Sequence, residues 1–297
     1  MPKRIPSDPY RHLRLANKHE SLALFVGAGL SYGCGLPKWD ELLDRMTVAA
    51  FPKDHATARN ALEGLPQIVK TRFIKNILGT RFNEVIADAL YQTPYTISGP
   101  LKKIAKSGIR RICTYNFDDT IEEALQSEGI RFDVVGPGEP FNTSSWGTVL
   151  FHPHGIIPSD ADRAQLQGQQ IVFSEDDFNS LYSNAHSQAN LIQISLLLNF
   201  TCLFVGISFN DPNLRRILDV CRSAGLRTRH YAIMMSPMYA AADWSKPIKR
   251  KVKEYIEMDL EQFRIEPIFV RNNKDIEGIF ESIRNRNGIV RAATQFV

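Results

Sequence analysis

The chain has 297 residues, 43% of them hydrophobic and 23% charged, which is the balance of an ordinary globular protein. A net charge of +4 is too small to indicate nucleic-acid binding by itself. No apolar run approaches the roughly 20 residues of a membrane helix, and the first residues lack the apolar segment of a secretory signal. We therefore expect a cytoplasmic protein without a membrane segment.

The four cysteines are Cys34, Cys113, Cys202 and Cys221. None belongs to a C-x-x-C pair, and their spacings fit no zinc site. Three of them stand beside apolar residues, which favours buried free thiols in a reducing compartment. We expect no metal site.

Apolar runs of strand length recur along the chain, and most are continuous, as in strands buried on both faces. Segments with helical spacing of apolar residues lie between them, such as 39–46, 121–125, 191–198 and 214–221. This alternation predicts an α/β fold: a Rossmann-like, doubly wound, mostly parallel sheet. The predicted strands are 22–26, 111–114, 131–135, 148–151, 171–173, 202–205, 231–235 and 265–270.

One region does not alternate. Residues from about 53 to 107 show only helical spacing, first at Ile68, Phe73 and Ile77 and then at Val85 and its neighbours. We interpret this region as a helical insertion that forms part of the active-site cleft. Residues 1–297 would then be one domain, since no linker or repeat divides them.

The first predicted strand runs into a glycine-rich turn, FVGAGLSYGCGLPKW. Gly27 and Gly29 would let the backbone turn sharply and approach a ligand, and free N–H groups after such a turn can hold a pyrophosphate. Gly33 comes one residue later than the dinucleotide fingerprint requires. The glycines alone leave two interpretations open, a phosphate-binding turn and a tight turn without a ligand.

Polar residues also follow later predicted strands, where ligands of parallel sheets bind. Asn116 and Asp118 are candidates for ligand contact, although either could simply cap the next helix. His152 and His154 follow another strand, and an imidazole there can accept or orient a hydroxyl proton. The pair lacks the companion ligands of a metal site.

Four motifs in this order resemble the sirtuin family: G-A-G-x-S with G-x-P-x-W, T-x-N-x-D, His-Gly and G-x-S. The resemblance implies a Rossmann-like domain that binds NAD+. It assigns Asn116 to the nicotinamide ribose and the reacting water, His154 to the ribose hydroxyls and Asp118 to the nicotinamide side. The remaining positions that it assigns to NAD+ binding are Gly27, Ala28, Gly29, Ser31, Pro37, Trp39, Thr114, Gly206 and Ser208.

The chain lacks the two C-x-x-C pairs of the zinc ribbon that protein-deacylating sirtuins carry. It looks more like the zinc-free branch found in bacterial antiphage systems, whose members hydrolyse NAD+. That implies an NAD+ hydrolase that releases nicotinamide and ADP-ribose without a metal, as an effector of abortive infection. The alternatives are an NAD-dependent deacylase or ADP-ribosyltransferase, and a regulatory subunit that binds NAD or ADP-ribose without turnover.

The basic stretch 246–253, KPIKRKVK, allows contact with nucleic acid or an acidic partner. A solvated helix face is the simpler interpretation because the total charge is so modest. An NADase must be restrained, and the sequence shows no sensor domain of its own. We therefore expect control by oligomerisation, as a homo-oligomer, or by a separate protein. The resemblance implies a ring-forming, helicase-like ATPase encoded alongside as that partner.

Overall fold

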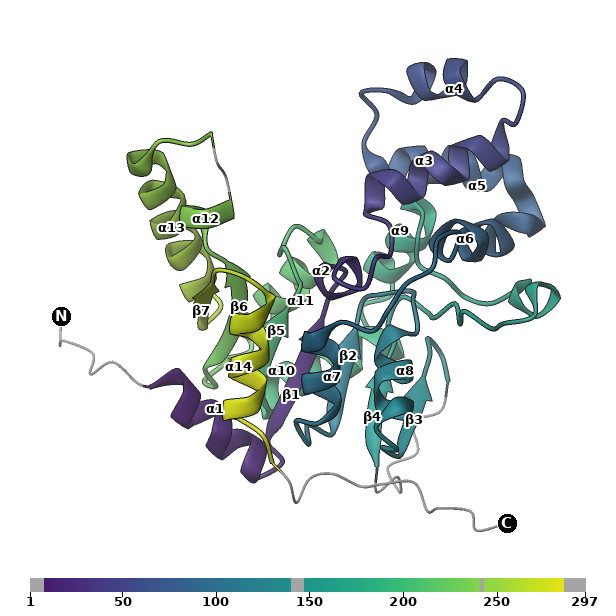
Figure 1. Cartoon of the computed structure of the whole chain (residues 1–297). Helices are drawn as coiled ribbons and strands as arrows, with labels where there is room; N and C mark the ends of the chain where they lie inside the picture. The colour runs from purple at the N-terminus through teal and green to yellow at the C-terminus, as the bar shows by residue number, and fades with distance from the viewer. Residues whose placement is uncertain (1–7, 140–146, 241–242, 286–297) are drawn as a thin grey trace, which may run out of the picture.

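The computed structural model describes residues 8–139, 147–240 and 243–285. Its strands form one sheet in the order β3-β4-β2-β1-β5-β6-β7, and every pairing between them is parallel. The predicted fold class is therefore confirmed (Figure 1). None of the described helices is long and apolar enough to cross a membrane. The strands are Leu22–Val26 (β1), Arg111–Thr114 (β2), Phe132–Val135 (β3), Thr148–Phe151 (β4), Thr201–Val205 (β5), His230–Met235 (β6) and Ile265–Val270 (β7).

Helices cover both faces of this sheet, which makes it doubly wound. Successive strand residues point to opposite faces, so Leu24 joins one hydrophobic cluster and Phe25 the other. The first cluster includes side chains of Pro9–Lys18 (α1), Gly99–Ala105 (α7), Thr120–Ser127 (α8) and Asn273–Ser282 (α14). The second includes side chains of Gln188–Asn199 (α10), Pro212–Ser223 (α11) and the end of Lys246–Glu261 (α13).

A group of helices stands beyond the carboxyl ends of the strands, at the upper right of Figure 1. Its own hydrophobic cluster includes Met46, Ile74 and Ile86, and also Phe117 and Phe173 from loops beside the sheet. These helices therefore pack against the segment that follows β2. They are Trp39–Ala50 (α3), His55–Leu62 (α4), Gln67–Leu78 (α5), Gly79–Arg81 (η1) and Phe82–Leu90 (α6).

The remaining described helices are short. Pro237–Ala240 (α12) contacts α13, and Glu175–Ser183 (α9) contacts both α5 and α11. The other two are Gly29–Tyr32 (α2), directly after β1, and Arg163–Leu166 (η2), which contacts α6.

Two helices bury a different face from the one that their apolar spacing indicated. In α5, Phe73 and Ile77 are each 49% exposed, whereas Ile74 and Leu78 pack inward. In α10, Leu191 is 49% exposed, and the fully buried positions include two polar residues, Asn190 and Gln193. Their amides have partners: Asn190 Nδ2 donates to the carbonyls of Leu181 and Asn184, and Gln193 Oε1 accepts from Tyr115 Oη. An amide whose hydrogen bonds are satisfied can be buried. The buried face of α10 was therefore predicted wrongly, because its polar residues were assigned to the surface.

The predicted strand over 171–173 is wrong. This segment pairs with no strand, and the Val172 N–H donates to the carbonyl of His154 at 2.9 Å. The side chains do alternate: Ile171 and Phe173 join the helical group, and Val172 packs against Leu181. The apolar residues of this segment thus indicated that it is buried, but not that it pairs with a strand.

His230, the first residue of β6, makes stability depend on pH. Its Nδ1 accepts the Cys202 N–H at 3.1 Å, and burial lowers its pKa to about 4, helped by the charge of Arg264. The unfolded chain binds a proton near pH 6.5, so stability is complete above that pH and declines as pH falls toward 4. We expect a loss of about 2 kcal/mol between pH 7.5 and pH 5 from this group.

Urea unfolding at the two pH values measures this loss. His230→Asn keeps an acceptor near Nδ1 but cannot titrate, and its unfolding free energy should vary less between them. An equal decline in the variant would contradict the assignment.

Candidate functional site

Two turns meet at the centre of the sheet, one after β1 and one after β5. The Gly27 N–H donates to the Val205 carbonyl, and the Gly29 N–H donates to the Gly206 carbonyl, both at 3.0 Å. A Cβ on Gly27 would stand 2.5 Å from the Gly206 oxygen, and Gly206 itself has φ +69°. The glycines are therefore required where two backbones touch. Since Gly29 already donates within the protein, its N–H is not available to a phosphate.

We expect Gly27→Ala to lower the free energy of unfolding by about 1–3 kcal/mol, since the new methyl cannot fit between the turns. Gly278→Ala on α14 is the matched control, because a Cβ there meets nothing within 4 Å. Urea unfolding of both variants gives the comparison. Equal stability of Gly27→Ala and the wild type would show that the turns can separate.

A pocket of about 560 Å³ opens beside these turns. The pocket lies at the end of β1, between the half of the sheet that contains β2 and the half that contains β5. Ligands of such folds usually bind at this position. The pocket contains five of the predicted ligand residues: Gly27, Ala28, Gly29, Gly206 and Ser208. Sequence reasoning missed other lining residues, among them Tyr32, Tyr115, Asp211 and Asn273.

Ser31, Asn116 and Asp118 form a buried polar cluster at the ends of β1 and β2. Asn116 Nδ2 donates to Ser31 Oγ at 2.8 Å, and Ser31 also hydrogen bonds to Asp118. Burial raises the pKa of Asp118, against hydrogen bonds from Thr120 and Ser31 that lower it. Asn116 Oδ1 is buried and has no partner among the described residues. Asn116 does not cap α8, whereas Asp118 Oδ1 does accept the Thr120 N–H at 3.2 Å.

His154 lies in an aromatic enclosure. Its ring centroid is 5.1 Å from that of Tyr115 and 5.5 Å from that of Phe178, and the residue is 5% exposed. Burial lowers its pKa, although the charge of Asp211 and a hydrogen bond with the Tyr115 backbone raise it. Nε2 has no partner within the described residues, so Nδ1 makes that bond and Nε2 carries the lone pair. A neutral His154 can therefore accept a proton.

His152 has a different setting. Its Nε2 lies 2.6 Å from Glu122 Oε1, and both side chains are buried. Its backbone N–H still bonds to the Val135 carbonyl. This histidine is thus held at the sheet by a carboxylate of α8.

The pocket lining does not include Ser31, Asn116, Asp118 or His154. Tyr115, which does line it, precedes Asn116 in the chain and lies against the His154 ring.

Pro37, Trp39 and Thr114 do not line the pocket either. The Trp39 ring stacks on Phe173 with centroids 4.5 Å apart, and Thr114 Oγ1 accepts the Asn116 N–H at 3.2 Å. Pro37 is buried just before α3. Trp39 thus packs with the helical group, and Thr114 holds the backbone of Asn116.

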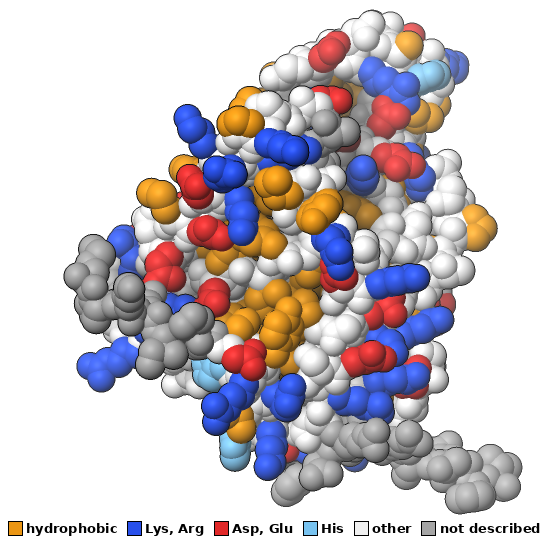
Figure 2. All heavy atoms as spheres, turned by 60° about the vertical axis from the view of Figure 1, so that its left-hand side comes forward, with side chains coloured by type: hydrophobic (Ala, Val, Ile, Leu, Met, Phe, Trp, Pro, Cys, Tyr) orange, Lys and Arg blue, Asp and Glu red, His pale blue; other side chains and the backbone are white. Residues whose placement is uncertain are grey.

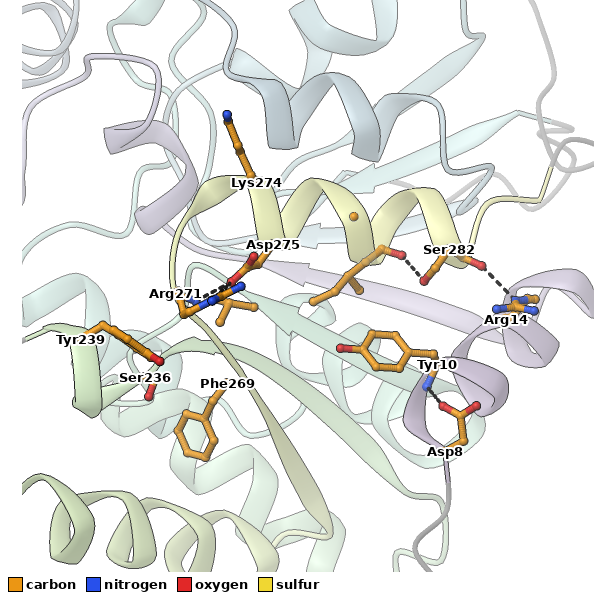
Figure 3. A pocket seen from close by; sticks show the side chains of 13 residues that line it. Asp8, Tyr10, Arg14, Ser236, Tyr239, Phe269, Arg271, Lys274, Asp275 and Ser282 are labelled. Atoms are coloured by element: carbon orange, nitrogen blue, oxygen red, sulfur yellow. Dashed lines mark hydrogen bonds and ion pairs between the residues drawn. The ribbon is translucent and has the colours of Figure 1, made fainter.

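A second hollow, of about 850 Å³, lies between α1, α14 and β7 (Figure 3). It contains none of the predicted site residues. Most of its charged groups have internal partners: Arg271 pairs with Asp275, and Arg14 donates to the Ser282 carbonyl at 2.9 Å. The Lys274 ammonium has no such partner among the described residues. The predicted residues therefore identify the central pocket as the candidate site.

Residues 110–263 match the family model described as a SIR2-like domain. The chain belongs to the SIR2-like family. This match confirms the resemblance to sirtuins that the four motifs indicated. Within residues 8–139, 147–240 and 243–285, the SIR2-like chain shows no group of three or more His, Cys, Asp or Glu that could hold a metal.

The chain is 30% identical over 276 residues to "NAD(+) hydrolase ThsA" of Bacillus cereus (strain MSX-D12), covering 90% of this chain and 54% of that protein. It is 28% identical over 277 residues to "NAD(+) hydrolase ThsA" of Acinetobacter baumannii (strain 532279), with 91% and 54% covered. "Defense-associated sirtuin 2" of Bacillus subtilis is 24% identical over 244 residues, with 82% and 23% covered. The SIR2-like chain thus spans about half the length, or less, of these curated relatives.

A solved structure described under "Structural Basis for the Mechanism and Regulation of Sir2 Enzymes" aligns with a TM-score of 0.44 and 13% identity. The alignment covers 93% of this chain and 97% of that one.

Proposed function

We propose that this SIR2-like chain cleaves NAD+ into nicotinamide and ADP-ribose. One observation supports this most: Asn116 Oδ1 and His154 Nε2 are buried and lack partners in the described structure, beside Tyr115, which lines the glycine pocket. Buried polar groups without partners are rare, and a ligand is a common explanation. The names of the ThsA relatives specify the same substrate and reaction.

Each residue has a role in this proposal. The pocket walls around Gly27 and Ser208 receive the adenosine and phosphate portion, because both residues line the pocket at the centre of the sheet. The N-glycosidic bond breaks, and nicotinamide departs with the bonding electrons. Water then adds to the anomeric carbon of the ribose and loses a proton.

Polar groups at the strand ends would stabilise this reaction. Asn116 positions the water and the nicotinamide ribose, and Asp118 places the nicotinamide side. His154 Nε2 accepts a hydrogen bond or a proton from a ribose hydroxyl. Preorganised groups of this kind act strongly in a site that excludes bulk water, and Asn116 and His154 are each 5% exposed.

We also propose a biological setting, from the one reported relative that is named for defence and from the resemblance to antiphage proteins. NAD+ depletion in the cytoplasm would halt an infected cell. Control would come from self-association or from a separate helicase-like ring ATPase, as the resemblance implies. Direct nucleic-acid contact is not part of this proposal. The helical insertion over about 53–107 would contribute to the cleft around the nicotinamide through α5 and α6, since its last helix, α7, packs against the sheet.

The test is to incubate the purified chain with NAD+, alone and with candidate partners, and to follow nicotinamide and ADP-ribose by chromatography. Equal amounts of both products are expected. Transfer of ADP-ribose to protein would indicate a transferase, loss of acyl groups from a peptide would indicate a deacylase, and binding without products would indicate a regulatory subunit.

We expect cleavage to need no metal. The chain has four buried free cysteines and no C-x-x-C pair. Turnover should be equal with and without EDTA, and elemental analysis should show no stoichiometric zinc. Loss of activity in EDTA that zinc restores would contradict this expectation.

A further inference from the structure

The central pocket has one charged side chain in its lining, that of Asp211. Lysine and arginine side chains are common elsewhere on the surface, as Figure 2 shows for the side of α12 and α13. Among the described residues, none of these cations lines the pocket, whose other walls are glycine, apolar, aromatic or uncharged polar. A ligand in the pocket therefore meets a negative charge that no other lining residue neutralises.

The fold uses only one oxygen of the Asp211 carboxylate. Oδ1 accepts the N–H groups of Asn213 and Leu214, at 2.7 and 3.4 Å, and so caps α11. Oδ2 has no hydrogen-bond partner in the part of the chain that the structure describes. An ionised carboxylate has acceptor capacity on both oxygens. Oδ2 is thus available to a ligand in the pocket.

The backbone just before Asp211 is held in a costly conformation. Phe209 has φ +60°, in a region that bulky side chains rarely adopt. Its ring is 5% exposed and lies 5.2 Å from the ring of Phe204 in the core, which keeps the turn in this conformation. Backbone strain of this kind gathers at functional sites. It therefore directs attention to the carboxylate that follows.

Asp211 lies on the side of the pocket that faces the candidate catalytic histidine. Burial raises the pKa of Tyr115, and the charge of Asp211 raises it further. Burial lowers the pKa of His154, and the same charge opposes that shift. Since the Tyr115 and His154 rings are 5.1 Å apart, one carboxylate influences both groups.

The two halves of NAD+ carry different charges. The pyrophosphate is negative, whereas the nicotinamide ring is positive. When the N-glycosidic bond breaks, the positive charge passes to the ribose. A carboxylate attracts that charge and repels the pyrophosphate, and both effects are stronger in a pocket that excludes bulk water. Asp211 therefore suits the nicotinamide ribose rather than the phosphates.

We propose that Asp211 is a further catalytic residue. Its Oδ2 accepts a hydrogen bond from a hydroxyl of the nicotinamide ribose, and its charge stabilises the positive charge that forms on that ribose. This ribose has two free hydroxyls, so one remains for Asp211 when His154 takes the other. The inference rests on the proposed NAD+ cleavage and adds a residue to it. The bonding electrons leave with nicotinamide, water adds and loses a proton, and Asp211 exchanges no atom.

Asp211→Asn tests the proposal, because asparagine caps helices about as well as aspartate. With Oδ1 kept as the cap, the substitution removes the charge and puts an NH2 donor in place of Oδ2. We expect kcat for NAD+ to fall at least about tenfold. The fall in kcat should exceed the rise in KM, since the positive charge on the ribose develops only in the transition state. The melting temperature should change little.

Asp219→Asn is the matched control. It removes an exposed carboxylate from the same helix, one that pairs with Arg222 and does not line the pocket. We expect wild-type kcat and KM in this variant. Wild-type kcat in Asp211→Asn as well would overturn the proposal, because Asp211 would then be a helix cap and no more.

The pH profile provides a readout that a merely structural role would not change. Asp211 supplies the charge that opposes the effect of burial on His154. Removing it lowers the pKa of His154 further, so the acid limb of turnover should move to lower pH in Asp211→Asn and stay in place in Asp219→Asn. The rings packed against His154 carry no charge near neutral pH; they are those of Tyr115, Phe117 and Phe178.

Calorimetry with ADP-ribose and with ADP locates the contact without turnover. Both ligands contain adenosine and pyrophosphate, and only ADP-ribose has the second ribose. Asp211→Asn should lower the ratio of ADP-ribose affinity to ADP affinity at least about threefold, because the new NH2 group cannot accept the hydroxyl proton. An unchanged ratio would overturn the proposal, and so would a wild type that does not bind ADP-ribose.

The binding ratio also separates this inference from the proposed function. A wild type that binds ADP-ribose but releases no nicotinamide from NAD+ would contradict the cleavage. A lowered ratio in Asp211→Asn would still assign the ribose contact in that case. Cleavage by the wild type with an unchanged ratio would leave the proposed function standing and remove Asp211 from it.

Discussion

Asn116→Ala should reduce NAD+ cleavage by at least about 10²-fold, the usual cost of removing a polar group positioned at a reacting centre. Asn116 Nδ2 donates a hydrogen bond to Ser31 Oγ, and this bond fixes the orientation of the buried Oδ1 atom. The substitution shortens one buried side chain, so the fold should survive. Nicotinamide release by the purified variant measures the effect, with the melting temperature as a check on folding.

Ser31→Ala is the companion variant. It removes the anchor but keeps the amide, so we expect a smaller loss of turnover than in Asn116→Ala. Combining both substitutions should cost little more than Asn116→Ala alone, since the anchor acts through the amide. Wild-type turnover in a folded Asn116→Ala protein would show that the site is misassigned.

Substitution of the two neighbouring histidines should have clearly different effects on turnover and stability. His154→Ala should eliminate turnover, because it removes the neutral imidazole whose Nε2 is free to act as a base. His152→Ala should instead destabilise the fold by about 1–3 kcal/mol, since it leaves the buried Glu122 carboxylate without its partner. Turnover and melting temperature of both variants give the comparison.

The pH dependence offers a second measurement on His154. Burial lowers its pKa below the ordinary value of 6.5, so the neutral form persists as pH falls through that value. Turnover of the wild type should therefore decline only below pH 6.5. Full activity in His154→Ala together with an inactive, folded His152→Ala would reverse the two assignments.

The sheet could be predicted from the sequence because parallel strands buried on both faces give continuous apolar runs. Seven of the eight predicted runs are strands. The exception, 171–173, is as apolar as the others, but it bonds to the turn at His154 rather than to a strand. A run of apolar residues indicates that a segment is buried. Strand pairing also requires a neighbouring segment, which the local sequence does not specify.

The site was predictable where its residues follow strands and only in part elsewhere. Glycine turns and polar strand ends directed attention to Gly27, Asn116 and His154. Tyr115 lines the pocket, contacts the His154 ring and donates a hydrogen bond to Gln193. Aromatic residues are common at strand ends, so the sequence alone did not mark Tyr115 as a site residue. Asp211 caps α11, and only the folded chain brings its charge near His154.

The meeting of the two glycine turns has a dynamic consequence. Their hydrogen bonds continue the β1–β5 ladder past the strand ends, so the pocket floor cannot open unless the centre of the sheet separates. Amide protons of Gly27 and Gly29 should then exchange with deuterium only through global unfolding, among the slowest in the chain. Any motion that admits a ligand must come from the surrounding helices, whose amides should exchange far sooner.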